Sequence, residues 1–383
     1  MKTLQHPLIS QASGTQRHLV SHHFGTPGAR PKVYVQASLH ADELPGMLVA
    51  HHLYQLLTQA ESKGQLQGEV VLVPVANPIG LDQTVMHSQL GRFELATASN
   101  FNRGYPLFAK WLCEPGFEVW PQLGADMRQN QQTVRAAMHQ ALDRHPPVTE
   151  LESLRHTLMR LSLDADVVLD LHCDFEAALH MYTEPPCLQT LLPLAQYMQA
   201  RAMLVAEGSG GHCFDEVLSG VWWQLHQAHR QQHGDQAAQH KPLGQGCASV
   251  TVELRGQTEV SHPVAQQDAQ AIMHYFAHLG VVAGQAPNPP ALPCEVTPLT
   301  GTQVLSAPHP GVIVFHVQAG ADVKVGDVLF DIVEPLTGKV SSLKAEVDGV
   351  MYARHIVRWA TTGLEVARVS GATPRRSGYL LSA

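Results

Sequence analysis

The strongest constraint on the fold is a series of short apolar, β-branched runs that alternate with stretches of helical periodicity. The apolar runs cover residues 33–38, 69–77, 167–173, 202–206 and 248–254. Apolar residues recur at helical spacing over about 45–60, 130–160 (with a break at Pro146-Pro147), 187–200, 215–232 and 263–279. Strands that are buried on both faces read as continuous apolar runs, and their alternation with helices is typical of α/β proteins. We therefore expect an α/β fold with a mixed, mostly parallel sheet flanked by helices.

Composition divides the chain into two parts. A proline-rich linker, residues 286–294, separates residues 1–285 from residues 295–383. The second part contains short β-prone pieces between glycine turns, which predicts an all-β, barrel-like domain similar to biotinyl and lipoyl folds. Its Lys339 lacks the neighbours of a modified carrier lysine, so we expect a structural appendage packed near the mouth of the site. Residues 105–163 are expected to form a helical insertion, as a lid or as the contact of a homo-oligomer.

Overall composition excludes several classes of function. The 383 residues are 44% hydrophobic and 15% charged, as in a globular protein. The net charge of −8, without clusters of Lys or Arg, argues against a nucleic-acid partner. Residues 1–7 lack an apolar signal core and no stretch approaches about 18 apolar residues, so we expect a cytoplasmic protein without a membrane partner. The six cysteines form no Cys-x-x-Cys pair and are expected to be reduced.

Two of the apolar runs end in side chains that bind metals. His40 and Glu43 follow the first run in a His-x-x-Glu loop, and Asp170, His172 and Cys173 end the third. Ligands collect beyond the carboxyl ends of such strands, and two imidazoles with one carboxylate suit a zinc site that keeps a position for water. The alternative is that His40 and Glu43 only bond loop backbone. Cys173 is expected to be a packed thiol, whereas Asp170 shares a face with His172 and either orients that ligand or caps a loop.

Two further segments carry groups suited to a substrate and to proton transfer. Asn102 and Arg103 lie side by side in a loop, and the rigid guanidinium fork matches a carboxylate. Over residues 249–256 the valines face one way, so Thr251 and Glu253 face the other. A carboxylate near the end of that strand suits a general base on zinc-bound water. The alternatives are a surface salt bridge for the arginine and a core strand with one edge-facing glutamate.

Taken in this order, the segments resemble the succinylglutamate desuccinylase/aspartoacylase family, a branch of the zinc carboxypeptidase fold. The resemblance covers about residues 30–280. It implies one Zn²⁺ per chain and the following site residues: the zinc ligands His40, Glu43 and His172, the catalytic Glu253, and the substrate-carboxylate pair Asn102 and Arg103.

Three further positions are matched through the same resemblance. Arg92 is the nearest candidate for the family's arginine that polarises the scissile carbonyl. Tyr352 is the candidate for a late tyrosine that helps to close the site, and Asn77-Pro78 fits the family's Asn-Pro loop. Arg92 is therefore expected to be catalytic together with Glu253.

The resemblance implies a zinc-dependent hydrolase of amino-acid metabolism that cleaves the linear amide bond of a small N-acylated amino acid or a related diamino acid. Two alternatives stay open: a metallocarboxypeptidase that acts on peptides, and a non-catalytic zinc-binding accessory protein linked to amino-acid transport. Glu253 argues against the accessory protein, because a pure binder has no need of a base there.

Overall fold

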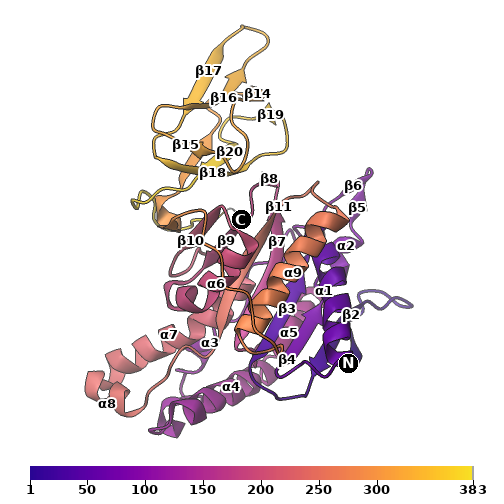
Figure 1. Ribbon diagram of the computed structural model, residues 1–383, viewed down its shortest axis with the longest axis vertical. Coiled ribbons are helices and arrows are strands. Elements are labelled where there is room, and N and C mark those ends of the chain that lie inside the picture. The colour runs from indigo at the N-terminus through magenta and orange to yellow at the C-terminus, as the bar shows by residue number, and fades with distance from the viewer. Residues whose placement is uncertain (382–383) are drawn as a thin grey trace.

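A nine-stranded mixed sheet forms the centre of the larger part of the molecule, in the order β1-β2-β4-β3-β7-β11-β9-β10-β12 (Figure 1). The computed structural model describes residues 1–381, so the last two residues of the predicted β domain, 382–383, lie outside the described residues. The strands are β1 (Lys2–Pro7), β2 (His18–Gly25), β3 (Lys32–Ala37), β4 (Glu69–Val73), β7 (Val167–Asp174), β9 (His180–Thr183), β10 (Ala202–Val205), β11 (Ala248–Gly256) and β12 (Val296–Pro298). Strands β4, β3, β7 and β11 run parallel to one another, as do β9, β10 and β12, whereas β9 is antiparallel to β11. The expected α/β class and mixed, mostly parallel sheet are confirmed.

Helices cover both faces of this sheet (Figure 1). One face packs against α1 (Pro45–Ser62), α6 (Leu188–Met198) and α9 (His262–His278). The other packs against α3 (Phe108–Trp111), α4 (Met127–Asp143), α5 (Glu150–Ser162) and α7 (Phe214–His233). Along β3, Val33 and Val35 are buried against the first layer and Tyr34 against the second, because successive strand residues face opposite sides. This two-sided burial explains why the strand sequences are apolar throughout.

Residues 105–163 form part of the second helical layer. They contain α3, the short 3₁₀ helix η1 (Trp120–Gln122), α4 and α5. Pro146-Pro147 lies between α4 and α5, and α5 begins with a capping box in which Thr149 and Glu152 satisfy each other's backbone N–H groups. Buried residues of α4 and α5, such as Val134 and Leu154, belong to the core beneath the sheet. This segment is thus a layer of the core rather than a cover over the site.

The C-terminal part consists of two small antiparallel sheets, β13-β20-β18-β15 and β17-β16-β14-β19, drawn at the top of Figure 1. Its strands are β13 (Gln303–Ser306), β14 (Gly311–Phe315), β15 (Asp322–Val323), β16 (Val328–Val333), β17 (Val340–Lys344), β18 (Gly349–Arg354), β19 (Trp359–Ala360) and β20 (Glu365–Val369). The chain reaches this part only after β12 has paired with β10 in the large sheet. Lys339 lies in the exposed turn between β16 and β17.

The C-terminal sheets dock onto the edge of the larger part. Strand β18 pairs with β8 (Glu176–Ala177), which follows β7. Glu176 forms ion pairs with Arg354 at 2.6 Å and with Arg358 at 2.5 Å, and Tyr182 and Tyr352 are buried in one apolar cluster at the junction. The two parts therefore share a continuous interface that includes the end of β7.

Composition led to two expectations: that the cysteines are reduced, and that no segment is long and apolar enough to span a membrane. All six cysteines are free, and Cys173 is buried. No helix within residues 1–381 combines the length and the apolar character needed to cross a bilayer.

The remaining short elements are α2 (Pro78–Leu81), α8 (Asp235–His240), η2 (Pro185–Cys187), η3 (Leu299–Gly301) and the hairpin β5 (Thr84–Val85) and β6 (Ser88–Gln89).

Candidate active site

The loop between β3 and α1 directs His40 and Glu43 into the interior. Ser38, the first residue after β3, has φ of 58°, a left-handed conformation that turns the chain at the end of the strand. Its hydroxyl donates to the Glu43 carbonyl at 2.6 Å and its N–H donates to the Leu171 carbonyl at 3.3 Å. These bonds tie the loop to itself and to β7, and both His40 and Glu43 are buried.

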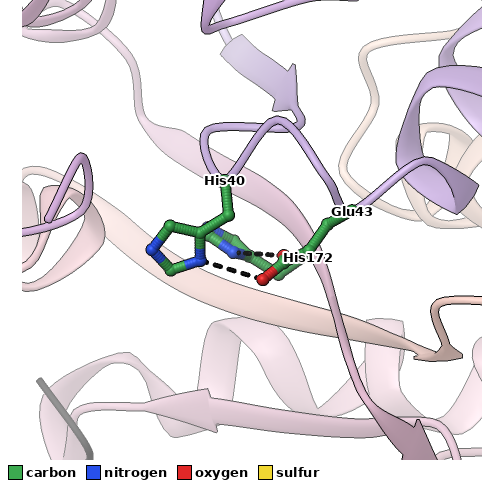
Figure 2. A group of neighbouring side chains, drawn as sticks. All are labelled: His40, Glu43 and His172. Atoms are coloured by element: carbon green, nitrogen blue, oxygen red, sulfur yellow. Dashed lines mark hydrogen bonds and ion pairs between the residues drawn. The ribbon is translucent and has the colours of Figure 1, made fainter. Parts of the chain in front are cut away.

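His172 meets this loop near the end of β7 (Figure 2). One carboxylate oxygen of Glu43 lies 2.9 Å from His40 Nδ1, and the other lies 2.8 Å from His172 Nδ1. One potential ligand atom from each residue lies within 4.8 Å of the other two. Within residues 1–381 this buried group could hold a metal ion, and it unites the three residues predicted as ligands.

Each histidine has a second polar partner. His40 Nε2 donates to Asn100 Oδ1 at 2.9 Å, since an amide oxygen only accepts. His172 Nε2 lies 3.0 Å from Asp170 Oδ2, within ion-pair distance but outside hydrogen-bond angles. The other oxygen of Asp170 accepts from Gln36 Nε2 at 2.9 Å. Partners of this kind fix the ring orientation of metal-binding histidines, so Asp170 is suited to orienting His172.

The pKa values of the three residues are displaced in different directions. Burial opposes protonation of His172, but the charges of Asp170 and Glu43 outweigh it and raise the pKa of that imidazole well above its ordinary value. Burial and then the charge of Arg92 lower the pKa of His40 to about 4, so this imidazole is neutral. Its proton lies on Nε2, which leaves a lone pair on Nδ1 facing an oxygen of Glu43. Burial opposes ionisation of Glu43, but the charge of His172 outweighs it and holds the pKa of that carboxyl well below its usual range. A lone pair and a carboxylate 2.9 Å apart repel unless a cation lies near both, and the Arg92 guanidinium, 3.4 Å from each, is such a cation. Two imidazoles and one carboxylate are also a donor set that suits zinc.

Glu253 reaches the same place from β11. Val250 and Val252 are buried in the core beneath α1, α6 and α9, so Glu253 faces the opposite side, as the alternation predicts. Its Oε2 atom is buried and has no hydrogen-bond partner within residues 1–381. Burial, followed by the negative charge of Glu43, raises the pKa of Glu253 well above its ordinary value. An acid with a raised pKa and an unsatisfied oxygen is able to accept and return a proton.

Arg92 also lies beside the ligands. Its Nη1 atom is 3.4 Å from Glu43 Oε1 and 3.4 Å from His40 Nδ1, and its side chain is partly exposed at the pocket wall. The preceding Gly91 allows this approach, because a Cβ there would lie 2.1 Å from the Asp42 nitrogen. The close contact between these two loops requires glycine and brings the guanidinium to the metal-binding group.

Asn102 and Arg103 form a second polar wall. Asn102 Oδ1 accepts from the Phe214 N–H at the start of α7 at 2.8 Å. Arg103 Nη1 donates to the Asn102 carbonyl at 2.7 Å and lies 3.2 Å from Cys213 Sγ. A Cβ on Gly211 would lie 2.5 Å from Arg103 Cδ, so the loop before α7 packs closely along the arginine. Both predicted substrate-binding residues therefore line the same pocket as the metal-binding group.

One pocket of about 470 Å³ contains every residue predicted as a metal ligand, a catalytic group or a substrate-carboxylate contact: His40, Glu43, Arg92, Asn102, Arg103, His172 and Glu253. The C-terminal part supplies one wall, which includes Arg354, His355, Leu364, Val366 and Arg368. The predicted packing of this part near the mouth of the site is thus present. Its individual pocket residues were not predicted, because residues distant in sequence give no local sign that they will meet the catalytic part.

The pocket tyrosine differs from the one expected. Tyr352 is fully buried and is not part of the pocket wall among residues 1–381; its ring lies 4.8 Å from His180 in the junction between the two parts. Tyr182, on the four-residue strand β9, lines the pocket instead. The assignment of a closing role to Tyr352 is therefore wrong. Strand β9 is too short to give a clear sequence pattern, which is why Tyr182 was missed.

Two further carboxylates, Asp215 and Glu216, line the pocket near Arg103. Burial, followed by the charge of Glu216, raises the pKa of Asp215 to about 7. Burial likewise raises the pKa of Glu216. In the sequence these residues fall in the first turn of a helix, where acidic side chains are common, so nothing there indicated a pocket.

Comparison with protein families gives a match over residues 29–279 to the succinylglutamate desuccinylase/aspartoacylase catalytic domain. This range contains all the predicted metal ligands and all the predicted catalytic and substrate-carboxylate residues, but not Tyr352. A comparison with curated proteins gives no match.

Three solved structures share the overall fold. A protein of the succinylglutamate desuccinylase/aspartoacylase family from Shewanella amazonensis is 27% identical, with 97% of this chain and 98% of that chain covered and a TM-score of 0.81. A second from Shewanella frigidimarina is 24% identical, with 97% of each chain covered and a TM-score of 0.80. A third from Rhodobacter sphaeroides is 17% identical, with 96% and 94% covered and a TM-score of 0.64. The similarity extends over both parts of the chain.

Proposed function

Because the chain belongs to the succinylglutamate desuccinylase/aspartoacylase family, we propose that it is a zinc-dependent hydrolase that cleaves the amide bond of a small N-acylated amino acid. The observation that carries the proposal is the position of Glu253. Its unpartnered Oε2 atom is buried in the same pocket as the His40, Glu43 and His172 group. A metal-binding group without a neighbouring base would suit a structural site, whereas this pairing suits hydrolysis.

His40, Glu43 and His172 would hold the ion through two imidazole Nδ1 atoms and a carboxylate. When bound, zinc would lower the pKa of a coordinated water toward about 7 and polarise the scissile carbonyl. Glu253 Oε2 takes the proton of the attacking water and then delivers it to the departing amine nitrogen. The raised pKa of Glu253 suits this exchange, because a strongly acidic carboxylate would hold a proton too weakly.

Arg92, Asn102 and Arg103 supply the polar contacts to the substrate. Arg92 lies 3.4 Å from Glu43 and is partly exposed, so its guanidinium can turn to the carbonyl oxygen as negative charge develops there. Asn102 and Arg103 lie on the opposite loop and bind the substrate carboxylate, which fixes the amide against Glu253. Contacts to the substrate and transfer of the proton are thereby assigned to different residues, with Glu253 alone in the second role.

The size and the enclosure of the pocket favour a small substrate over a peptide. Its volume of about 470 Å³ is within the range of small-molecule sites, and the C-terminal wall with Arg354, Leu364 and Val366 lies across one side. We propose that residues from 295 onward act as this non-catalytic wall and that residues 1–285 carry the chemistry.

The proposal is tested by a substrate screen on the purified, zinc-loaded protein. We expect hydrolysis of N-acetyl or N-succinyl amino acids, detected as release of the free amine, and loss of that activity after chelation and its return with zinc. Peptides with a free C-terminus form the comparison set. Preferential cleavage of those peptides would make the protein a carboxypeptidase, and zinc-independent or absent hydrolysis would refute the proposal.

A further inference from the structure

The loop that precedes α7 is rich in glycine and packs along Arg103. Residues 208–212, the glycine loop, have the sequence Gly-Ser-Gly-Gly-His, and all of them except Ser209 have positive φ, between 56° and 101°. Gly211 lies against the aliphatic part of the Arg103 side chain, and its carbonyl accepts from the Gly104 N–H at 2.9 Å. The backbone beside the proposed carboxylate-binding arginine is therefore formed by residues that have almost no side chains.

A segment of this composition depends on its neighbours for a fixed conformation. Glycine loses more conformational freedom on folding than other residues, and it has no side chain whose contacts would offset that loss. On the pocket side, the Ser209 N–H donates to Glu216 Oε1 at 2.7 Å. Cys213, which follows the loop directly, places its Sγ atom 3.2 Å from Arg103 Nη1. The position of the loop thus bears on the position of the guanidinium.

Residues 377–381, the C-terminal strap, hold the glycine loop from elsewhere in the fold. The Leu380 N–H donates to the Ser209 carbonyl at 2.8 Å. A Cβ on Gly210 would lie 2.5 Å from Tyr379 Cδ1, so the tyrosine ring rests directly on the loop backbone. Glycine is required at 210 and at 211, because the strap approaches the first and Arg103 approaches the second more closely than a side chain permits. One loop therefore contacts both the strap and the arginine.

The strap is anchored in the junction between the two parts of the molecule. Leu380 is 5% exposed and belongs to the apolar cluster that contains Tyr182 and Tyr352. Leu381 packs against the same cluster and lines the pocket. Tyr379 is 78% exposed, so its ring adds little to the core apart from its contact with the glycine loop. A buried anchor beside an exposed ring is suited to holding a loop.

From these contacts we infer that Leu380 and Tyr379 are positioning residues for Arg103: they hold the glycine loop, and the loop holds the guanidinium toward the pocket. The inference rests on the proposed function in assigning the substrate carboxylate to Arg103, and it goes beyond that function in the two residues it adds. Release of the strap should weaken substrate binding and leave the chemical step at Glu253 intact, so KM should change more than kcat.

Steady-state kinetics of zinc-loaded variants with the best N-acyl amino acid test this. We expect Leu380→Ala to raise KM by about 3- to 10-fold with kcat within about twofold of wild type, and Tyr379→Ala to raise KM by a smaller factor. Leu380→Met keeps the anchor and should restore the wild-type KM. Leu336→Ala changes a 93% exposed leucine of the C-terminal part and is the matched control. If Leu380→Ala does not fold, Tyr379→Ala, at an exposed position, decides the comparison.

The double variant Arg103→Ala/Leu380→Ala shows whether the strap acts through the arginine. If it does, Leu380→Ala should have no further effect on KM in the Arg103→Ala background, because changes along one chain of contacts are not additive. Independent effects that multiply in the double variant would overturn the inference. So would a wild-type KM in both Leu380→Ala and Tyr379→Ala, or a loss confined to kcat.

Hydrogen exchange tests the same contacts without turnover. In Leu380→Ala, the amides of residues 208–212 and the Gly104 N–H should exchange at least about tenfold faster than in wild type, whereas strands β3 and β7 should stay protected. Unchanged exchange in the glycine loop would overturn the inference even where N-acyl amino acids are hydrolysed. Faster exchange in a protein that hydrolyses none of them would overturn the proposed function and leave the hold of the strap on the loop standing.

Discussion

Glu253 on β11 is the direct register partner of His172 on β7, its parallel neighbour in the sheet. Neighbouring strands lie about 4.8 Å apart, so the proposed base and one proposed metal ligand are held next to each other by backbone hydrogen bonds. Two residues earlier, Thr251 is paired in the same way with Asp170, which lies beside His172. The sheet register thus fixes the spacing between ligand, supporting carboxylate and base without any contribution from flexible loops.

This relationship makes Glu253→Gln the sharpest test of the mechanism. Glutamine keeps the shape of the side chain but cannot accept a proton, so kcat should fall by about 10²- to 10⁴-fold with little change in KM. Zinc content should stay at the wild-type level, because Glu253 is not among the residues grouped around the proposed metal position. Glu259→Gln, an exposed acid just after β11, is the control. Wild-type turnover by Glu253→Gln would rule out this residue as the proton carrier.

Metal content tests the ligand set separately from activity. We expect about one zinc per chain by elemental analysis, because two imidazoles and one carboxylate converge in a buried position. His172→Ala should lose most of this zinc, since it removes one of three ligands. His18→Ala, which changes an exposed histidine outside the pocket, should retain it. Full zinc content in His172→Ala would show that the ion binds elsewhere.

Local sequence pattern was sufficient to find the metal-binding group. His40, Glu43 and His172 each follow a strongly apolar run, and parallel strands bring their carboxyl ends to one edge of the sheet. The direction of Glu253 followed from the alternation of valines along one strand. In these cases the relevant information lies within about ten residues of the site residue.

The rest of the pocket depends on contacts that no local pattern contains. Tyr182 enters through the register between β9 and β11, and Arg368 arrives from a strand nearly 200 residues beyond His172 in the sequence. The N-terminal strands β1 and β2, which extend the sheet by antiparallel pairing, were also not predicted, because His and Ser interrupt their apolar alternation. These parts of the pocket and of the sheet could not be predicted from local sequence, because pairing between strands distant in the chain determines where they lie.

Removal of the Arg103 guanidinium should act mainly on substrate binding. Arg103→Ala is expected to raise KM by about 10- to 100-fold with a smaller change in kcat, because the carboxylate contact exists both before and during the reaction. Arg103→Lys keeps the charge but not the fork, so it should recover only part of the loss. Steady-state kinetics with the best N-acyl amino acid measure both constants. A fall in kcat at unchanged KM would instead give Arg103 a role in the transition state.

The stability of the fold should depend on the protonation of Glu184, next to Asp215 and Glu216. Burial raises the pKa of Glu184 from 4.5 to about 8, although hydrogen bonds from Ser219 and Trp223 oppose the shift. The folded protein therefore keeps this proton up to about pH 8, whereas the unfolded chain releases it near pH 4.5. Because the folded state then binds more protons than the unfolded state, the contribution of Glu184 to the free energy of unfolding falls as pH rises across this window.

Glu184→Gln should remove that pH dependence. Glutamine resembles the neutral acid, so the variant and the wild type should have similar free energies of unfolding near pH 5 and should diverge toward pH 8, where the variant becomes the more stable by up to a few kcal/mol. Urea titrations at several pH values between 5 and 8.5 measure the difference, and Glu207→Gln provides an exposed-acid control. If the two curves stay parallel across the window, Glu184 is already ionised in the folded protein and its pKa is not raised.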